Sequence, residues 1–267
     1  MTHRVLFKGR LTLGLPLFLL AFLFLPSTAG AQDLFEIQVY PYETVARRHT
    51  MMEFHMNFFP SGTKTGANGE FPLHHQFHFT TEITHGFTKH FELAGYLVTA
   101  WVPDHGFKFA GARVRPRFRL PEKWRLPFKF SLSTEVGFNK HRFDANTITL
   151  ELRPIIEKEL GKWYLSFNPN LSKSFKGEDS HRGFAFEPGV KVSYAVTKRV
   201  EPGLEYYADT GPVTHFEPLK DQHHIIFPTV DINTTPNWEL NFGIGRGLTG
   251  SSEHWIVKWI VGYRFSF

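Results

Sequence analysis

Residues 255–267 read Trp255-Ile256-Val257-Lys258-Trp259-Ile260-Val261-Gly262-Tyr263-Arg264-Phe265-Ser266-Phe267. Every odd position in this stretch is aromatic or Val, whereas a lysine, a glycine, an arginine and a serine share the even positions with two isoleucines. Successive side chains of a strand point to opposite faces. The stretch therefore predicts a strand with one strongly apolar face and one mixed face.

An alternating strand that ends on a terminal Phe resembles the C-terminal signature by which bacterial outer-membrane β-barrels are recognised for assembly. In this sequence Tyr263, Phe265 and Phe267 would form that assembly signal. The resemblance implies a barrel in the bacterial outer membrane, with outer-membrane lipid and the barrel assembly machinery as partners.

Residues 1–31 have the composition of a cleaved signal peptide. Arg4, Lys8 and Arg10 precede an apolar run from Leu11 to Leu25, and the small residues of Thr28-Ala29-Gly30-Ala31 follow. The alternative is a membrane anchor, but this run is shorter than the roughly 20 residues that a spanning helix needs. We predict an exported chain that begins at Gln32.

The composition excludes several classes of protein. Without the three bases of residues 1–31, the 30 Lys+Arg of the chain fall to 27 against 25 Asp+Glu, so net charge gives no support to nucleic-acid binding. The chain contains no cysteine, which excludes disulfides and thiolate metal sites. Its 29 Phe coexist with a mean hydropathy of -0.24, as half-apolar strands with one wet face would produce. We predict no cofactor.

The alternation recurs in segments of about 9–11 residues, the length of a tilted membrane strand. The clearer segments lie at 52–58, 76–83, 128–139, 148–153, 163–171, 184–194, 200–206 and 255–267, and the weaker ones at 91–102, 107–120, 223–233 and 238–247. These twelve segments predict an all-β fold, a transmembrane antiparallel up-and-down β-barrel over residues 48–267. The alternative is a soluble periplasmic barrel or sandwich.

Connection lengths support the strand count, because outer-membrane barrels have short periplasmic turns and longer outer loops. Short connections are expected at 85–90, 121–127, 161–162, 196–199 and 234–237, and longer ones at 60–71, 174–183, 210–222 and 247–253. Two outer connections, at 103–106 and 141–145, are exceptions because they are short. The positions of five tryptophans also agree with this arrangement of the strand ends. Trp124, Trp163 and Trp238 fall at the predicted periplasmic ends, and Trp101 and Trp255 at the outer ends.

Two features depart from an ideal barrel. Prolines at 116, 154, 169, 188, 202 and 228 fall inside predicted strands, so we expect bulges there or displaced strand boundaries. Residues 32–47 alternate only as far as Pro41. This segment is expected to be a periplasmic tail, a plug in the lumen or an additional strand.

Near the C-terminus the sequence resembles a known family. Residues 237–249 read NWELNFGIGRGLT, and WIVK at 255–258 and GYRF at 262–265 follow. They resemble the end of the outer-membrane transporters of the meta-pathway of phenol degradation. The resemblance implies transport of small compounds, including aromatic ones, and identifies no binding residue.

The most chemically distinctive feature is the row Arg113, Arg115, Arg117 and Arg119, opposite apolar residues at 114, 116, 118 and 120. An arginine facing lipid costs about 2–4 kcal/mol at the bilayer midplane, so the row is expected to face the lumen. Glu135, Glu151 and Arg153 occupy polar positions of the next predicted strands and complete the predicted lumen or solute-binding set.

Two interpretations of the arginine row remain open. It could attract anionic solutes, as charged rings do in channels. Alternatively, it could be structural and paired with carboxylates at 82, 92, 135, 151, 187, 205 and 231, filling a closed interior. A hairpin symmetric about residues 122–125 would bring Arg113 near Glu135.

Histidines and serines give weaker signals. His74, His75 and His78 are close in sequence, but strand geometry separates His74 from His78 by about 13 Å, so we predict no metal site. Ser172-Lys173-Ser174 and Ser251-Ser252-Glu253-His254 lie near the predicted outer rim, where lipid-directed hydrolases of this membrane place Ser and His. They show no triad motif, and we predict that the chain is not an enzyme.

The sequence therefore predicts an outer-membrane channel or facilitator for passive passage of small solutes through a charged lumen. The alternative is a closed outer-membrane barrel with a structural or lipid-directed enzymatic role. The solute stays unidentified.

Overall fold

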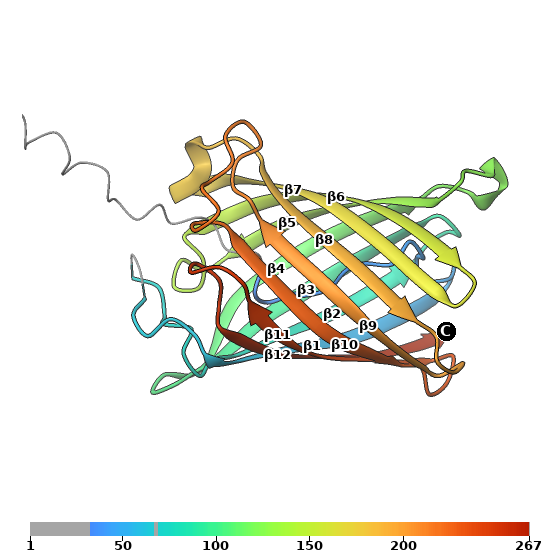
Figure 1. Cartoon of the computed structure of the whole chain (residues 1–267), viewed down its shortest axis with the longest axis horizontal. Coiled ribbons are helices and arrows are strands. Elements are labelled where there is room, and N and C mark those ends of the chain that lie inside the picture. The colour runs from blue at the N-terminus through green and yellow to red at the C-terminus, as the bar shows by residue number, and fades with distance from the viewer. Residues whose placement is uncertain (1–32, 67–68, 267) are drawn as a thin grey trace, which may run out of the picture.

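The computed structural model describes residues 33–66 and 69–266. The predicted signal peptide, residues 1–31, and Phe267 of the predicted assembly signal lie outside the described residues. The described chain forms a closed antiparallel barrel of twelve strands, which confirms the predicted fold. Each strand pairs with its neighbours in sequence, and β12 pairs with β1 to close the barrel (Figure 1).

The strands are β1 (His49–Ser61), β2 (Phe77–Gly86), β3 (Phe91–Val102), β4 (Gly106–Arg119), β5 (Lys129–Asn139), β6 (Asn146–Leu160), β7 (Trp163–Gly177), β8 (Ala185–Tyr194), β9 (Val200–Asp209), β10 (His223–Ile232), β11 (Trp238–Gly247) and β12 (Trp255–Ser266). Two short 3-10 helices, η1 (Glu122–Trp124) and η2 (Glu178–His181), lie in connections. In the described part of the chain, no helix is both long and apolar enough to cross a membrane.

The strand alternation separates an apolar outer surface from a mostly polar interior. On β4, Val114 and Phe118 are 47% and 57% exposed, whereas Arg115 between them is 1% exposed. Exposed large apolar side chains recur on the other strands in the same way, for example Leu97 on β3 and Ile244 on β11. A continuous apolar exterior of this kind suits contact with lipid.

The two ends of the barrel differ in their connections. Strands β2 and β3 are joined by four residues and β6 and β7 by two, whereas twelve or more separate β1 from β2 and β9 from β10. Short turns are typical of the periplasmic end and long loops of the outer end. The exceptions are β3 and β4, which are joined by three residues at the outer end, and β4 and β5, which are joined by nine at the periplasmic end. Trp163 and Trp238 are exposed at the periplasmic end, and Trp101 and Trp255 at the outer end.

The expected bulge is found beside only one of the prolines, Pro188. All six prolines lie inside strands, and the register is the same on both sides of Pro116, Pro154, Pro169 and Pro228. The β8–β9 ladder ends next to Pro188 and Pro202. Beyond Pro188, the pair of Gly189 with Tyr207 is followed by a bridge from Ala185 to Pro212, which is a shift of one residue. Near Pro116, Pro154 and Pro228, one ladder lacks a few pairs and then resumes in register. A proline lacks the N–H that a ladder needs, and a barrel with two neighbours per strand tolerates that local loss on one side.

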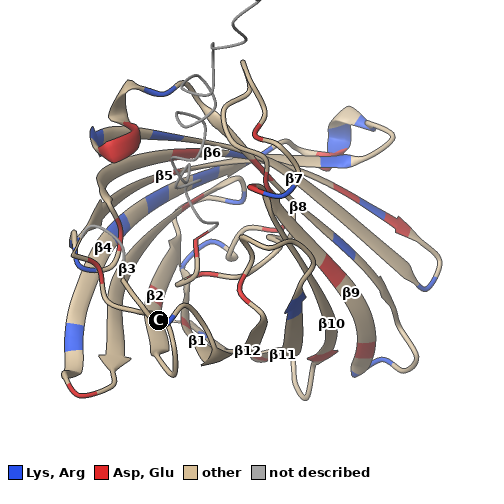
Figure 2. Cartoon of the chain, turned by 60° about the vertical axis from the view of Figure 1, so that its left-hand side comes forward, with Lys and Arg blue, Asp and Glu red and all other residues tan. Residues whose placement is uncertain are grey.

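Residues 33–47 lie inside the barrel, where they contact side chains from opposite walls (Figure 2). The backbone of this segment forms hydrogen bonds with side chains that line the lumen, and it does not pair as a strand. The Leu34 carbonyl accepts from Asn57 on β1, and the Ile37 carbonyl accepts from Lys258 on β12. Near the periplasmic end, the Val45 amide donates to Glu92 on β3.

Candidate functional site: the barrel lumen

One wall of the lumen, which we call the arginine side, consists of Arg113, Arg115 and Arg117 on β4 and Arg153 on β6. All four side chains are at most 7% exposed. They point inward because the alternation of each strand places its apolar neighbours toward lipid, where an arginine would be costly.

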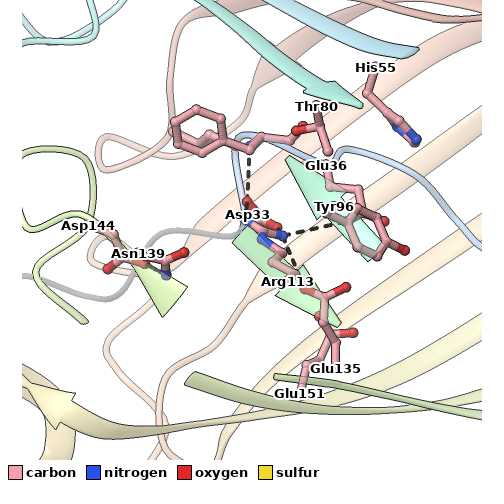
Figure 3. Close-up of polar contacts among 12 residues, drawn as sticks. Asp33, Glu36, His55, Thr80, Tyr96, Arg113, Glu135, Asn139, Asp144 and Glu151 are labelled. Atoms are coloured by element: carbon pink, nitrogen blue, oxygen red, sulfur yellow. Dashed lines mark hydrogen bonds and ion pairs between the residues drawn. The ribbon is translucent and has the colours of Figure 1, made fainter. Parts of the chain in front are cut away.

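Arg113 lies within a cluster of carboxylates (Figure 3). Its guanidinium donates to Asp33, to Glu36 at 3.5 Å and to Glu135 at 3.2 Å. The three carboxylates have oxygens within 4.8 Å of one another, which is close enough to hold a metal ion. In this structure the Arg113 guanidinium is the cation that they share.

Arg115 and Arg117 are paired in the same way. Arg115 bonds Glu82 at 2.5 Å and Glu92 at 3.2 Å. Arg117 bonds Glu92 at 2.6 Å and donates to the Pro41 carbonyl at 3.1 Å. The arginine row is therefore matched by buried carboxylates, as the structural interpretation of the row requires.

Tyr40 of the N-terminal segment lies at the centre of the arginine side. Its ring centroid is 4.1 Å from the Arg153 guanidinium carbon and 4.7 Å from that of Arg115. The Tyr40 hydroxyl lies 3.1 Å from the Tyr96 hydroxyl, and its backbone N–H donates to Asn168 at 2.7 Å. A cation placed over an aromatic ring is attracted to the ring face. The guanidinium groups of this wall therefore stabilise the position of Tyr40.

The opposite wall, which we call the apolar side, is made of Phe59, Tyr207, Ile225, Phe227 and Ile256, all at most 3% exposed. Ile37 and Val39 of the N-terminal segment pack against them. Lys258 lies beside this cluster and bonds Glu205, the Tyr207 hydroxyl and the Ile37 carbonyl. The segment is thus held by apolar packing on one side and by charged groups on the other.

Sequence reasoning missed the apolar side, since a polar lumen was expected. The available signal was in the final strand, where Ile256 and Ile260 occupy inward positions and are 0% and 3% exposed. On β11, Gly243 and Gly245 are also inward and buried, which leaves room for the side chains of β10.

The remaining predicted residues lie in different places. Arg119 is at the periplasmic end of β4 and donates to the Lys89 carbonyl at 2.7 Å. Glu151 pairs with Arg153 at 2.7 Å in the lumen. Tyr263 is 39% exposed on the outside of β12, with its ring 6.3 Å from that of Phe265. Recognition of these two residues as an assembly signal stays a prediction.

Two cavities lie in the lumen, and they share no lining residue. The larger, about 620 Å³, opens toward the periplasmic end, and the smaller, about 150 Å³, lies in the outer half. Tyr40 and Arg115 line the larger cavity, whereas Asp33 and Arg113 line the smaller one. The N-terminal segment and the side chains that hold it therefore separate the two spaces.

Carboxylates outnumber basic groups in both cavities. The larger is lined by eight carboxylates and five bases (Glu43, Glu53, Glu157, Glu159, Glu201, Glu205, Asp231, Glu239; Arg115, Arg117, Lys129, Lys191, Arg264). The smaller is lined by seven carboxylates and three bases (Asp33, Glu135, Asp144, Glu151, Asp179, Glu187, Asp209; Arg113, Lys173, Arg182). Burial raises the pKa of Asp144, in the outer connection between β5 and β6. Part of this negative charge is therefore lost as the pH falls.

The histidines and serines singled out from the sequence make contacts in several different parts of the barrel. His78 stacks on Phe35 in the lumen, while the rings of His74 and His75 stack on each other before β2 begins. The Ser252 hydroxyl bonds Thr249 and the backbone of His224. The Ser172 hydroxyl bonds Glu187.

Comparison with known proteins places this barrel in a family. A model of the family described as "Putative MetA-pathway of phenol degradation" matches residues 106–265, more than half of the chain. The chain belongs to this family. The match extends well beyond the residues 237–265 that carry the resemblance in the sequence. No curated protein sequence matches the chain.

Solved structures with the same fold are outer-membrane channels and porins. The COG4313 outer membrane channel from Pseudomonas putida F1 is similar with a TM-score of 0.57 at 13% identity, over 86% of this chain and 100% of that one. The NanC porin has a TM-score of 0.53 at 8% identity, over 82% and 100% of the two chains. The KdgM porin has a TM-score of 0.50 at 12% identity, over 81% and 99%. Together with the apolar exterior, this likeness in fold identifies a bacterial outer-membrane barrel.

Proposed function

We propose that this protein is an outer-membrane channel for the passive passage of small solutes. The observation that carries the proposal is the pair of lumen cavities separated by residues 33–47. The barrier includes this chain segment and the side chains that contact it. A modest displacement of this segment would join the cavities into one path, as gating by a mobile segment requires.

The lumen favours cations and neutral polar solutes over anions. An anion preference, which is one of the two interpretations of the arginine row, would need free guanidinium groups, but Arg113, Arg115 and Arg117 are each paired with buried carboxylates. Carboxylates exceed bases in the lining of both cavities, and such an excess would raise the local concentration of cations. The description of the family makes small aromatic compounds the first neutral solutes to test.

Planar-bilayer conductance tests this function. The full mature chain with Tyr40→Ala loses the ring that Arg115 and Arg153 hold between the cavities, so we expect larger conductance steps than in the wild type. The reversal potential in a salt gradient should indicate cation preference. Phe118→Ala on the lipid face is the matched control, because Phe118 is 57% exposed outside the lumen and its loss should leave conductance unchanged.

A silent Tyr40→Ala barrel that still migrates as a heat-modifiable species would contradict the proposal. A second variant lacking residues 34–41 covers the case in which one side chain does not open the path. If both variants fold and neither conducts, the lumen is closed by its walls.

The alternative is a closed barrel with a structural or lipid-directed enzymatic role. We place it second because, among the described residues, the hydroxyls of Ser172 and Ser252 bond a carboxylate, a threonine and backbone groups instead of a histidine ring. Release of fatty acid from phospholipid vesicles by the purified barrel, abolished by Ser252→Ala, would favour this alternative.

A further inference from the structure

A groove of about 460 Å³ lies at the outer rim of the barrel, between β4 and the connection from β5 to β6. We call it the outer groove. It is lined by three phenylalanines, three strong bases and a histidine: Phe71, Phe109, Phe143, Lys108, Lys140, Arg142 and His105. The outer groove shares no lining residue with either lumen cavity.

The groove exists because β4 extends beyond its partner. The β4–β5 ladder reaches only as far as Gly111 and Asn139, and one more bond joins the Lys140 N–H to the Ala110 carbonyl at 2.7 Å. The chain then turns away, and the Arg142 carbonyl accepts from the Phe71 N–H at 2.8 Å. In the ladders of the described residues, the first part of β4, from Gly106 to Phe109, therefore has no partner on the β5 side.

The floor of the groove is aromatic and its edge is basic. The Arg142 guanidinium carbon lies 4.2 Å from the centre of the Phe71 ring, and the Lys140 ammonium lies 5.8 Å from that of Phe109. Lys108, Lys140 and Arg142 are all exposed. Within the described part of the chain none of the three forms an ion pair, and no carboxylate lines the groove. This arrangement is complementary to an anion with an apolar part.

The groove lies at the level where lipid head groups meet the barrel. Trp101 and Phe107, which are 37% and 69% exposed, project from the outer ends of β3 and β4. Phe109 beside them is 47% exposed and also lines the groove. Aromatic side chains at strand ends mark the boundary between the hydrocarbon and the head groups. The bases of the groove are adjacent to this boundary on the outer side.

We propose that the outer groove binds the phosphorylated glycolipid of the outer leaflet. Lys108, Lys140 and Arg142 would hold a phosphate on its sugar head group, while the exposed Phe109 would contact the beginning of an acyl chain. Basic pockets beside a membrane surface bind lipid head groups by this combination of charge and apolar contact. The proposal does not depend on whether the lumen conducts.

Native mass spectrometry of the detergent-solubilised full chain tests the proposal with two probes, bis-phosphorylated lipid A and the same lipid with both phosphates removed. We expect the wild type to retain one phosphorylated lipid and to bind the dephosphorylated lipid at least tenfold more weakly. The variant Lys108→Gln/Lys140→Gln/Arg142→Gln should bind phosphorylated lipid at least tenfold more weakly than the wild type. The control Lys158→Gln/Lys162→Gln/Lys198→Gln removes the same charge from exposed positions near the periplasmic turns and should bind like the wild type.

Several results would overturn the proposal. Equal binding by the two triple variants would show that total charge, and not the groove, holds the lipid. Equal binding of the two lipids by the wild type would remove the role of phosphate. Full displacement of the lipid by millimolar inorganic phosphate would show that the groove binds free anions and not a lipid. Heat-modifiable migration of both variants confirms that each is folded, so weak binding cannot be attributed to unfolding.

Discussion

The arginine side and the apolar side of the lumen hold the same chain segment by opposite means. On the arginine side, Glu36 and Tyr40 meet buried guanidinium groups, and the carboxylates of β2 and β3 complete the neutralisation. On the apolar side, Ile37 and Val39 pack into a cluster with Phe227. Alternate residues of the N-terminal segment thus contribute to a charged cluster on one side and to an apolar cluster on the other.

The difference teaches that the interior of this barrel is organised like a protein core. A buried ion pair is costly to desolvate and becomes strongly destabilising when only one partner is removed. Truncation of a side chain in an apolar cluster lowers the free energy of unfolding roughly in proportion to the volume of the cavity left behind. The two sides should therefore respond differently to mutation, and the following comparisons separate them.

Arg115→Met should give the largest effect. It leaves Glu82 buried without its guanidinium partner, although Glu82 keeps its bond from Thr84. Removing one member of a buried pair costs about 3–5 kcal/mol in the free energy of unfolding. Urea-induced unfolding of the barrel in lipid vesicles measures this change in the free energy of unfolding. Adding Glu82→Gln to Arg115→Met should restore part of the loss, and an additive loss would mean that the two groups are not coupled.

Ile37→Ala tests the apolar side with a change in the segment itself. Ile37 is 2% exposed, so its truncation leaves a cavity, and Ile→Ala changes cost about 2–5 kcal/mol. We expect the lower part of this range, because the segment can shift toward the gap. The same unfolding assay applies. A cost below about 0.5 kcal/mol would indicate that the segment is not held by this cluster.

Gly245→Ala and Gly95→Ala form a matched pair. A Cβ at Gly245 would lie 2.3 Å from the Phe227 ring on the apolar side, whereas a Cβ at Gly95 meets nothing within 4 Å on the lipid-facing side of β3. Overpacking at Gly245 should cost about 1–3 kcal/mol. The Gly95 variant should stay within about 0.5 kcal/mol of the wild type. Equal costs would mean that strand propensity, and not packing, determines both.

Tyr40→Phe should give the smallest effect. It removes the hydroxyl that lies 3.1 Å from Tyr96 but keeps the ring between Arg115 and Arg153. The loss of one buried hydrogen bond costs about 1 kcal/mol. Conductance should match the wild type, in contrast to Tyr40→Ala. Larger conductance steps in the Tyr40→Phe variant would show that the contact between the Tyr40 and Tyr96 hydroxyls, and not the Tyr40 ring, forms the barrier.

Much of the fold was predictable from local patterns. The weaker segments 91–102 and 238–247 coincide with β3 (Phe91–Val102) and β11 (Trp238–Gly247), because alternation is enforced wherever one face meets lipid. The proximity of Arg113 to Glu135 also follows from a symmetric hairpin. Bulges or displaced boundaries were expected at all six prolines, because the sequence gives the missing N–H but not the second neighbouring strand that keeps the register at most of them.

The sequence by itself determined that this chain is a twelve-stranded outer-membrane barrel with arginines on the inward face of β4, since a period of two and the cost of charge in lipid are local properties. Only the tertiary structure decided what those arginines face. Residues 33–47 enter the lumen because distant strands there provide bonds for its backbone and two walls for its side chains. That pairing depends on residues up to 221 positions apart, a separation over which no local pattern operates.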